Sequence, residues 1–253
     1  MRKTRVLVAG SRGYVGSQIA RALDENPFYE CLSLCRGQDD LKLFAKADII
    51  IHAANPARRY FAEQNPKADF IETVEKTHRF LSLTQSKRFI LISSLSCRTQ
   101  LHLSYGIHRR ECEDLALAAN GAVIRLGPMF GGERTQDVLH DILASRMVYI
   151  SDKTKYAYAD VAVIAKKIVD SIEYLKGISE FGARNSIELA EIARRYESNT
   201  VFSGPIDTQI PENCFDGPDA YDVIKYADIE FSRMNELKKK LVDIFSTAKP
   251  RAL

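Results

Sequence analysis

Short apolar runs alternate with longer amphipathic segments over the first half of the chain. The runs are rich in β-branched residues, as is typical of strands buried on both faces of a parallel sheet. They lie at 4–9, 30–35, 48–53, 88–93 and 122–126. Between them, apolar residues three and four positions apart predict helices at 14–23, 40–46, 69–85 and 104–119. Repeated β-α-β units of this length predict an α/β fold, a doubly wound parallel sheet with helices on both faces.

One connection is shorter than this layout usually requires. Asp48, at the start of the third strand, comes only 12 positions after Arg36, at the end of the second. A full strand and helix do not fit there beside the short helix at 40–46. We therefore expect a trimmed crossover at this point.

The second half of the chain has less periodic strand signal. Helices are predicted at 160–175, 186–196 and 231–245, and the Pro-, Gly-, Asn- and Asp-rich segment 199–219 is predicted to be loop around a short strand. Leu237, Leu241 and Ile244 share one side of the last helix, which we interpret as packing within a small lobe. We expect one domain at 1–150 and a small α/β lobe at 151–253, with some chain returning to the main domain.

Composition narrows the class of protein. The 36 basic and 33 acidic residues give a net charge of +3, which is too even to indicate a nucleic-acid or membrane-surface partner. No apolar run reaches the roughly 20 residues of a membrane span, and the first run is too short for a signal-peptide core. Five scattered cysteines do not form a disulfide framework or a metal-ligand spacing. We expect a cytoplasmic protein without a metal site.

A glycine-rich turn carries the first candidate chemistry. Gly10, Gly13 and Gly16 lie between the first strand and the first helix, and Tyr14 and Val15 open that helix. Glycine lets the backbone turn sharply and lets a pyrophosphate approach the N–H groups at the helix N-terminus, where the helix dipole favours an anion. The spacing G-x-x-G-x-x-G in strand–turn–helix context predicts a Rossmann-like dinucleotide site.

The end of the second strand bears on the choice of dinucleotide. An acidic residue near this position binds the adenosine ribose hydroxyls of NAD, whereas an Arg accommodates the 2′-phosphate of NADP. Here the strand ends at Arg36, no acid follows before Asp39, and Arg12 lies in the glycine turn. Two guanidiniums suit one dianion, so NADP(H) is favoured and NAD(H) stays possible.

The ordered motifs resemble those of the extended and atypical short-chain dehydrogenases/reductases, which include nucleotide-sugar epimerases, dehydratases and reductases. The matching pieces are GSRGYVG, DIIIHAAN, FILISS, YGIHR, VIRLGPMFG and YADVA, which occur in the family's order over roughly residues 4–165. Within this family, an Arg in the glycine turn is most similar to the pattern of NADPH-dependent nucleotide-sugar reductases such as GDP-fucose synthase. The resemblance implies a Rossmann-like NAD(P)-binding domain and a small substrate-binding lobe.

The resemblance also implies roles for individual residues. Ser94 matches the family's catalytic hydroxyl, with Ser93 as its neighbour if the register differs by one, and Tyr105 matches the catalytic tyrosine. The residues implied to line the bound cofactor and substrate are Gly10, Gly13, Gly16, Ala54, Asn55, Pro128 and Met129.

A tyrosine can serve both directions of hydride transfer. Its hydroxyl donates a proton to a reduced carbonyl, or accepts one from an oxidised alcohol, when its pKa of about 10 is lowered toward neutrality. The family pattern Y-x-x-x-K supplies a lysine for this purpose, but this sequence has Arg109. Arg keeps the charge and lies on the same helix face as Tyr105, although its shape and hydration differ from those of Lys.

Three functions are consistent with these residues. The first is NADPH-dependent reduction of a keto group on a nucleotide-linked sugar or a related small metabolite. The alternative enzyme is a nucleotide-sugar 4-epimerase; a dehydratase is disfavoured because Leu95 and Ser96 stand where that reaction places an Asp-Glu pair. The alternative from another class is an NADP(H)-sensing binding protein, which Arg109 motivates. Besides the small-molecule substrate, the resemblance implies a possible homodimer paired through the long helices.

Overall fold

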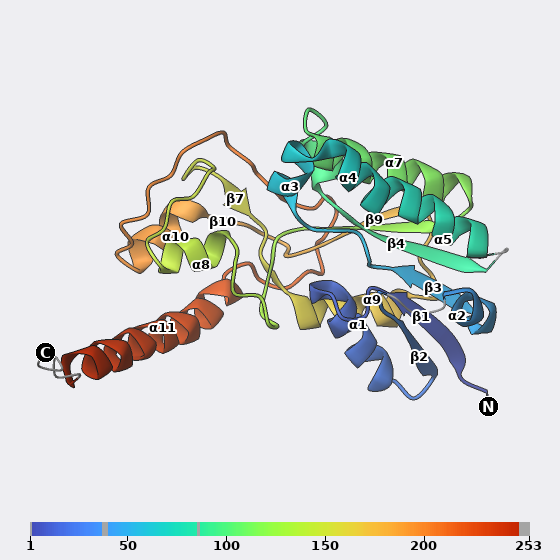
Figure 1. Cartoon of the computed structure of the whole chain (residues 1–253), viewed down its shortest axis with the longest axis horizontal. Coiled ribbons are helices and arrows are strands. Elements are labelled where there is room, and N and C mark those ends of the chain that lie inside the picture. The colour runs from blue at the N-terminus through green and yellow to red at the C-terminus, as the bar shows by residue number, and fades with distance from the viewer. Residues whose placement is uncertain (1, 37–39, 85–86, 248–253) are drawn as a thin grey trace, which may run out of the picture.

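The central element of the computed structural model is a six-stranded parallel sheet (Figure 1). The structure describes residues 2–36, 40–84 and 87–247. The strands lie in the order β2-β1-β3-β4-β5-β9. Their bounds are β1 Thr4–Ala9, β2 Tyr29–Leu34, β3 Ile49–His52, β4 Arg88–Ser94, β5 Ala122–Leu126 and β9 Ile178–Phe181. The predicted α/β class and parallel sheet are confirmed.

Helices cover both faces of this sheet, because successive residues of each strand point to opposite sides. In β1, Val6 and Val8 join the core beneath α1 and α9, whereas Leu7 and Ala9 join the core beneath α2, α5 and α7. The helices are α1 Tyr14–Asp24, α2 Asp40–Lys46, α3 Arg59–Gln64, α4 Pro66–Phe70, α5 Lys76–Thr84, α6 Ser96–Thr99, α7 Ser104–Ala118, α8 Val138–Leu143, α9 Val161–Ser171, α10 Leu189–Arg195 and α11 Asp222–Thr247.

The predicted trimmed crossover is present. Strand β2 is followed by α2 alone, and the chain then enters β3 on the other side of β1, so β2 forms the edge of the sheet. Further along, a π-helical turn, η1 (Ile71–Glu75), joins α4 to α5. The helix that the sequence predicts at 69–85 is therefore a composite of α4, η1 and α5.

The second half of the chain contributes to both parts of the molecule. Helix α9 packs against α1 and β9 pairs with β5, so 161–181 returns to the main sheet. A separate cluster of α8, α10 and short strands lies to one side (Figure 1). Four two-residue strands form two small sheets in this part of the chain. They are β6 Met129–Phe130, which pairs with β8 Ala159–Asp160, and β7 Lys155–Tyr156, which pairs with β10 Ile187–Glu188. The short strand expected within 199–219 is wrong: Phe202 and Gln209 form only isolated bridges.

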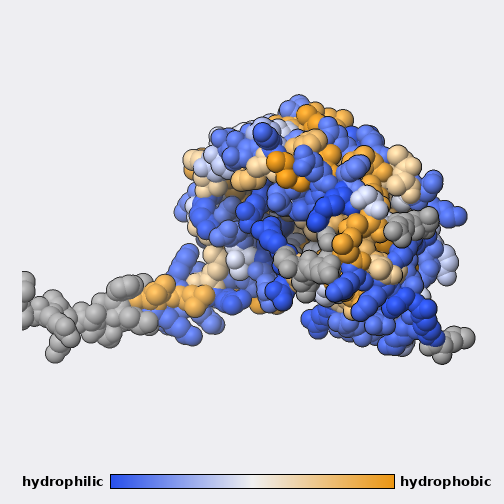
Figure 2. Space-filling model, turned by 45° about the vertical axis from the view of Figure 1, so that its right-hand side comes forward, coloured by the Kyte–Doolittle hydropathy of each residue, from blue (hydrophilic) through white to orange (hydrophobic). Residues whose placement is uncertain are grey.

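Helix α11 corrects another expectation. Its first turns pack through Val223 and Ala227 on the cluster of α8 and α10, which we call the lobe. The rest of the helix projects from the body of the molecule (Figures 1 and 2). Leu237 and Leu241 are 53% and 54% exposed, so the predicted packing of this stripe within the lobe is wrong. The side chain of Ile244 lies outside the described part.

Within the described ranges, no helix has the length and apolar character to cross a bilayer.

Candidate functional site

The glycine turn is built on a close approach of two backbones. Gly10 has φ +89°, and a Cβ there would lie 2.6 Å from the carbonyl oxygen of Ala53, at the end of β3. The N–H of Gly13 donates to the carbonyl of Gly10 at 2.8 Å, which closes the turn. Both features follow from residues without side chains, so the loop lies flat against the adjacent strand end.

Helix α1 starts at this turn with an open N-terminus. Gly13 is the N-cap and supplies no side-chain hydrogen bond, and the first turn carries no acidic residue. The N–H groups of Tyr14, Val15 and Gly16 have no carbonyl one turn earlier to bind. Gly16 packs on the turn itself: a Cβ there would lie 2.1 Å from the carbonyl oxygen of Gly10. The arrangement can therefore hold an anion against unpaired donors.

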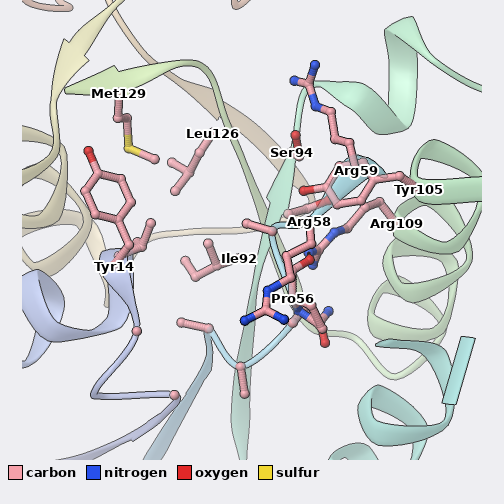
Figure 3. A pocket seen from close by; sticks show the side chains of 18 of the residues that line it. Tyr14, Pro56, Arg58, Arg59, Ile92, Ser94, Tyr105, Arg109, Leu126 and Met129 are labelled. Carbon is pink, nitrogen blue, oxygen red and sulfur yellow. Dashed lines mark hydrogen bonds between the residues drawn. The ribbon is translucent and has the colours of Figure 1, made fainter. Parts of the chain in front are cut away.

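A cavity of about 1420 Å³ extends from this turn across the carboxyl ends of the sheet strands (Figure 3). Ligands of open α/β sheets bind in this position. The cavity brings together most of the residues named from the sequence: Gly10, Arg12, Gly13, Tyr14, Val15, Arg36, Ala54, Asn55, Ser94, Tyr105, Arg109, Pro128 and Met129. Gly16 is not among its lining residues, and it acts through the packing of α1 on the turn.

Ser94 and Tyr105 face each other in this cavity although they come from different elements (Figure 3). Ser94 ends β4, and its hydroxyl lies 3.3 Å from both the hydroxyl and the N–H of Ser96. Tyr105 is the second residue of α7, is 6% exposed, and its N–H donates to the Glu63 carboxylate at 3.1 Å. Glu63 thus fixes the start of the helix that carries the phenol.

Ser93 has a different environment from Ser94. Its hydroxyl donates at 2.6 Å to Glu113, a fully buried carboxylate on α7 that is paired with Arg125 at 2.7 Å. Arg125 in turn contacts Glu180 of β9 at 3.2 Å. This buried network ties β4, β5, β9 and α7 together behind the cavity. Both serines line the cavity. The Ser93 hydroxyl is bound to the Glu113 carboxylate, whereas the Ser94 hydroxyl contacts only Ser96 among the described residues.

Arg109 lies one helical turn after Tyr105 and is 4% exposed. Its guanidinium carbon is 4.9 Å from the centroid of the Tyr105 ring, and Nη2 donates to the carbonyl of Pro56. Its Nε is buried without a partner among the described residues. The charge that replaces the family's lysine is therefore placed over the ring of the phenol and beside the loop after β3.

The cavity also contains a polar cluster around the buried Asp207. Asp207 accepts hydrogen bonds from Arg59 at 2.5 Å, from Tyr156 at 3.2 Å and from Gln209 at 2.6 Å. Arg59, Tyr156 and Gln209 line the cavity. Figure 3 shows Arg59 on the same side as Ser94 and Tyr105. No local motif signals this cluster, because its members come from three separate segments.

Tyr14 lies on the opposite side of the cavity, beside Met129 (Figure 3). The guanidinium carbon of Arg134 is 4.1 Å from its ring centroid, and its hydroxyl is buried without a partner among the described residues. Burial raises the pKa of Tyr14 well above its usual range, so the phenol stays protonated. Tyr14 thus forms part of the cavity wall where the first helix meets it, with Arg134 against its ring and its hydroxyl buried.

At the end of β2, Arg36 has an acidic neighbour from a distant part of the chain. Glu72, from η1, has its carboxylate 4.0 Å from Nη2 of Arg36 and 2.7 Å from Nζ of Lys76. All three residues line the cavity, and the Arg36 side chain is 93% exposed. Asp39, the nearest acid along the sequence, lies outside the described residues. Glu72 is remote from Arg36 in sequence, so no spacing could have indicated the pair.

Other groups near Tyr105 in the sequence do not share its cavity. His102 and His108 do not line it, and His108 bonds to the buried Asp69 at 2.7 Å. Cys97 lies 2.8 Å from Glu113, and burial, followed by this carboxylate, raises the pKa of Cys97 to about 12. Among the described residues, no three His, Cys, Asp or Glu side chains are placed to hold a metal ion.

Comparison with known proteins supports the fold. Neither a protein-family model nor a curated protein matches the chain. Solved structures do. UDP-glucuronic acid 4-epimerase from Bacillus cereus, in complex with a UDP-fluoro-sugar and NAD, is 14% identical, with a TM-score of 0.70 over 92% of this chain and 100% of that chain.

Two further structures are similarly close. dTDP-4-dehydrorhamnose reductase from Yersinia enterocolitica is 17% identical, with a TM-score of 0.72 over 89% of this chain and 99% of that chain. RMD from Pseudomonas aeruginosa, complexed with NADPH, is 15% identical, with a TM-score of 0.69 over 81% and 89% of the two chains. At these identities the likeness shows a shared fold, and it confirms at that level the resemblance that the motifs indicated.

Proposed function

We propose that this chain is a nicotinamide-dependent oxidoreductase that reduces a keto group on a nucleotide-linked sugar or a related small metabolite, with NADPH as the favoured cofactor. The observation that carries the proposal is one cavity lined by the glycine turn, Ser94 and Tyr105. The three come from separate segments, and hydride transfer requires all of them at one place: a cofactor site, a group to orient the carbonyl and a proton donor.

The chain fits a dinucleotide on its own geometry. The turn leaves no room for a Cβ at Gly10, and the N-terminus of α1 presents donors to a pyrophosphate. Asn55 lines the same cavity, and its buried side-chain carbonyl oxygen has no partner among the described residues. When bound, the nicotinamide supplies the hydride. Gly10, Gly13, Tyr14 and Val15 would hold the cofactor along the first helix.

Tyr105 would supply the proton. As the carbonyl carbon gains a hydride, its oxygen gains the phenolic proton, and the phenolate then recovers a proton from solvent. Ser94 would orient the same oxygen by donating its hydroxyl hydrogen. Lowering the pKa of a tyrosine from about 10 to neutrality requires roughly 4 kcal/mol of preferential phenolate stabilisation. Cations near the phenol of Tyr105 would have to supply this stabilisation.

Two arginines are placed to provide this stabilisation. Arg109 stacks over the phenol ring at 4.9 Å, and Arg59 lies on the same side of the cavity (Figure 3). Burial lowers the pKa of Arg59, but Tyr156, Asp207 and Tyr105 together raise it more, so the guanidinium stays charged. Arg109, which is buried, would favour the ionised phenol more than Arg59, which is partly exposed and paired with Asp207.

The lobe at 151–253 would recognise the rest of the substrate, as the proposed division of the chain requires. Tyr156, Tyr158 and Gln209 line the cavity and come from this segment. A substrate held there would present its reacting carbon toward Ser94 and Tyr105. A homodimer and a cytoplasmic location stay predictions from the sequence.

A 4-epimerase is the second candidate, and Glu72 is the observation that favours it. An acid beside the adenosine end suits NAD. An epimerase retains this cofactor, which would accept a hydride from the substrate and return it within each turnover. Net consumption of NADPH separates the two reactions, because an epimerase returns its hydride to the substrate.

The test follows nicotinamide absorbance with a panel of 4-keto nucleotide sugars. We expect the wild-type protein to oxidise NADPH with at least one of them, and Tyr105→Phe to lower turnover by about 10²- to 10⁴-fold while NADPH affinity changes less than about twofold. Tyr149→Phe is the matched control, because Tyr149 is exposed and does not line the cavity. NADPH binding without turnover across the panel, unchanged by Tyr105→Phe, would establish the sensing protein instead.

A further inference from the structure

The adenosine end of the cavity contains a charge that the sequence pattern of this fold does not include. In dinucleotide folds the residue that contacts the 2′ position follows the second strand. Here that position is Arg36, a cation, and the acid comes from a helix. Glu72 lies in η1, where Thr73 and Val74 are buried, and its side chain is directed to the cavity. The π-helical turn is a local irregularity of the kind that often accompanies functional sites.

Glu72 already binds the cations that a phosphate would need. Its Oε2 accepts from Nζ of Lys76 at 2.7 Å and lies 4.0 Å from Nη2 of Arg36. Lys76 also donates to the carbonyl of Ala54 at 3.3 Å, which holds the ammonium at the cavity wall. The hydrogen bond and charge of Lys76, with a smaller contribution from Arg36, lower the pKa of Glu72, so the carboxylate is ionised at neutral pH.

We propose that Glu72 sets the cofactor selectivity of this pocket by competing with the adenosine 2′-phosphate for Arg36 and Lys76. The inference rests on the proposed function, because it requires that a nicotinamide dinucleotide binds here. A phosphate monoester carries between one and two negative charges near neutral pH. It must either displace the carboxylate from these cations or bind beside a like charge. A 2′-hydroxyl meets no such cost and can donate to the carboxylate.

The consequence is a pocket that accepts both cofactors with a reduced preference for NADPH. Arg12 and Arg36 attract the phosphate, and Glu72 cancels part of that attraction. Removing the carboxylate should therefore strengthen NADPH selectively. Removing Arg36 should weaken NADPH selectively. Opposite signs from neighbouring side chains distinguish charge competition from a general disturbance of the site.

The experiment measures dissociation constants for NADPH, NADH and 2′,5′-ADP at one fixed ionic strength. For Glu72→Gln we expect NADPH and 2′,5′-ADP to bind about tenfold more tightly, with NADH unchanged or slightly weaker. Arg36→Ala should weaken NADPH about tenfold and leave NADH within about twofold. Glu75→Gln is the matched control, because Glu75 lies on the same turn, is exposed and does not line the cavity.

The outcomes separate the inference from the function on which it rests. If Glu72→Gln leaves the NADPH-to-NADH ratio unchanged, or weakens NADPH as Arg36→Ala does, Glu72 does not compete with the phosphate and the inference is wrong. If the wild-type protein binds neither dinucleotide, the proposed function itself fails. Glu72 is partly exposed, so its replacement by Gln is compatible with folding, which a thermal midpoint checks.

Discussion

The charged side chains at the two ends of the cavity differ in their exposure to solvent. At the adenosine end, Arg36 is almost fully exposed and Glu72 is half-exposed, and both contact solvent. At the reacting end, Tyr105 and Arg109 are buried, and they are fixed by contacts to the Glu63 carboxylate and the Pro56 carbonyl. The same types of charge thus occur in two different dielectric environments within one pocket.

This difference predicts different tasks. Exposed charges are screened by solvent and salt, so they shift binding by modest factors and suit the choice between similar ligands. Buried charges act strongly on neighbouring groups and cost much if left unpaired, so they suit the stabilisation of an ionised phenol. We expect substitutions at the reacting end to change turnover and those at the adenosine end to change cofactor preference.

The largest effect should come from the backbone that both ends share. Gly16→Ala places a methyl group 2.1 Å from the carbonyl oxygen of Gly10, so α1 or the turn must move. We expect a loss of roughly 2 to 3 kcal/mol in unfolding free energy and at least tenfold weaker binding of both dinucleotides. Denaturant titration and ligand titration measure the two effects. Ser17→Ala, one residue along the helix, is the control; equal behaviour of the two variants would mean that this packing does not support the site.

A second substitution tests whether the reacting end works through charge. Arg109→Ala should lower turnover about 100-fold and move the basic limb of the rate profile to higher pH, because the phenolate loses a cation. Arg109→Lys should restore turnover to within about tenfold of wild type. The split between kcat and cofactor affinity is the measurement. Equal impairment of the Ala and Lys variants, with a change in cofactor binding alone, would place Arg109 among the cofactor-binding residues. It would contradict the assignment of turnover to the buried charges.

The smallest predicted effect concerns a buried histidine, His52, and the pH dependence of stability. His52, at the end of β3, is fully buried and lies 3.1 Å from the Thr77 hydroxyl. Burial, then the charges of Lys76 and Arg109, lowers the pKa of His52 to about 3. The unfolded chain binds a proton at about pH 6.5 and the native protein does not, so stability falls as the pH falls below 6.5, by up to about 1.4 kcal/mol per unit.

His52→Gln should remove this slope between pH 6.5 and 5, above the range in which ordinary carboxylates titrate. Denaturant midpoints at several pH values provide the measurement, with His78→Gln as the control because His78 is exposed. A slope that persists unchanged in His52→Gln would show that His52 is not its source and that folding does not lower the pKa of His52.

Features determined by neighbouring residues could be predicted from the sequence. The bounds of β1 and β5 match their apolar runs, because residues such as Val6 and Ile124 are buried from both sides. The glycine turn could also be predicted, since its geometry depends on contacts between Gly10, Gly13 and Gly16. The roles of the individual site residues stay predictions, although the cavity brings nearly all of them together.

Features determined by tertiary contacts could not be predicted. Strand β9 was missed because only Phe181 of its four residues is buried, so it lacks an apolar run. The Asp207 cluster and the pairing of Glu72 with Arg36 join segments that are remote in sequence. Leu237 has the helical spacing of a packed residue, yet it extends past the lobe that would cover it. Periodicity indicates a face and does not indicate whether a partner lies against it.

Calorimetric titration of the folded protein with NADPH and with NADH tests the central claim most directly. The account predicts saturable one-to-one binding of both, tighter for NADPH, and abolished or strongly weakened in Gly16→Ala. A folded wild-type protein that releases no heat with either dinucleotide, and that gains no thermal stability from millimolar concentrations of them, would contradict it.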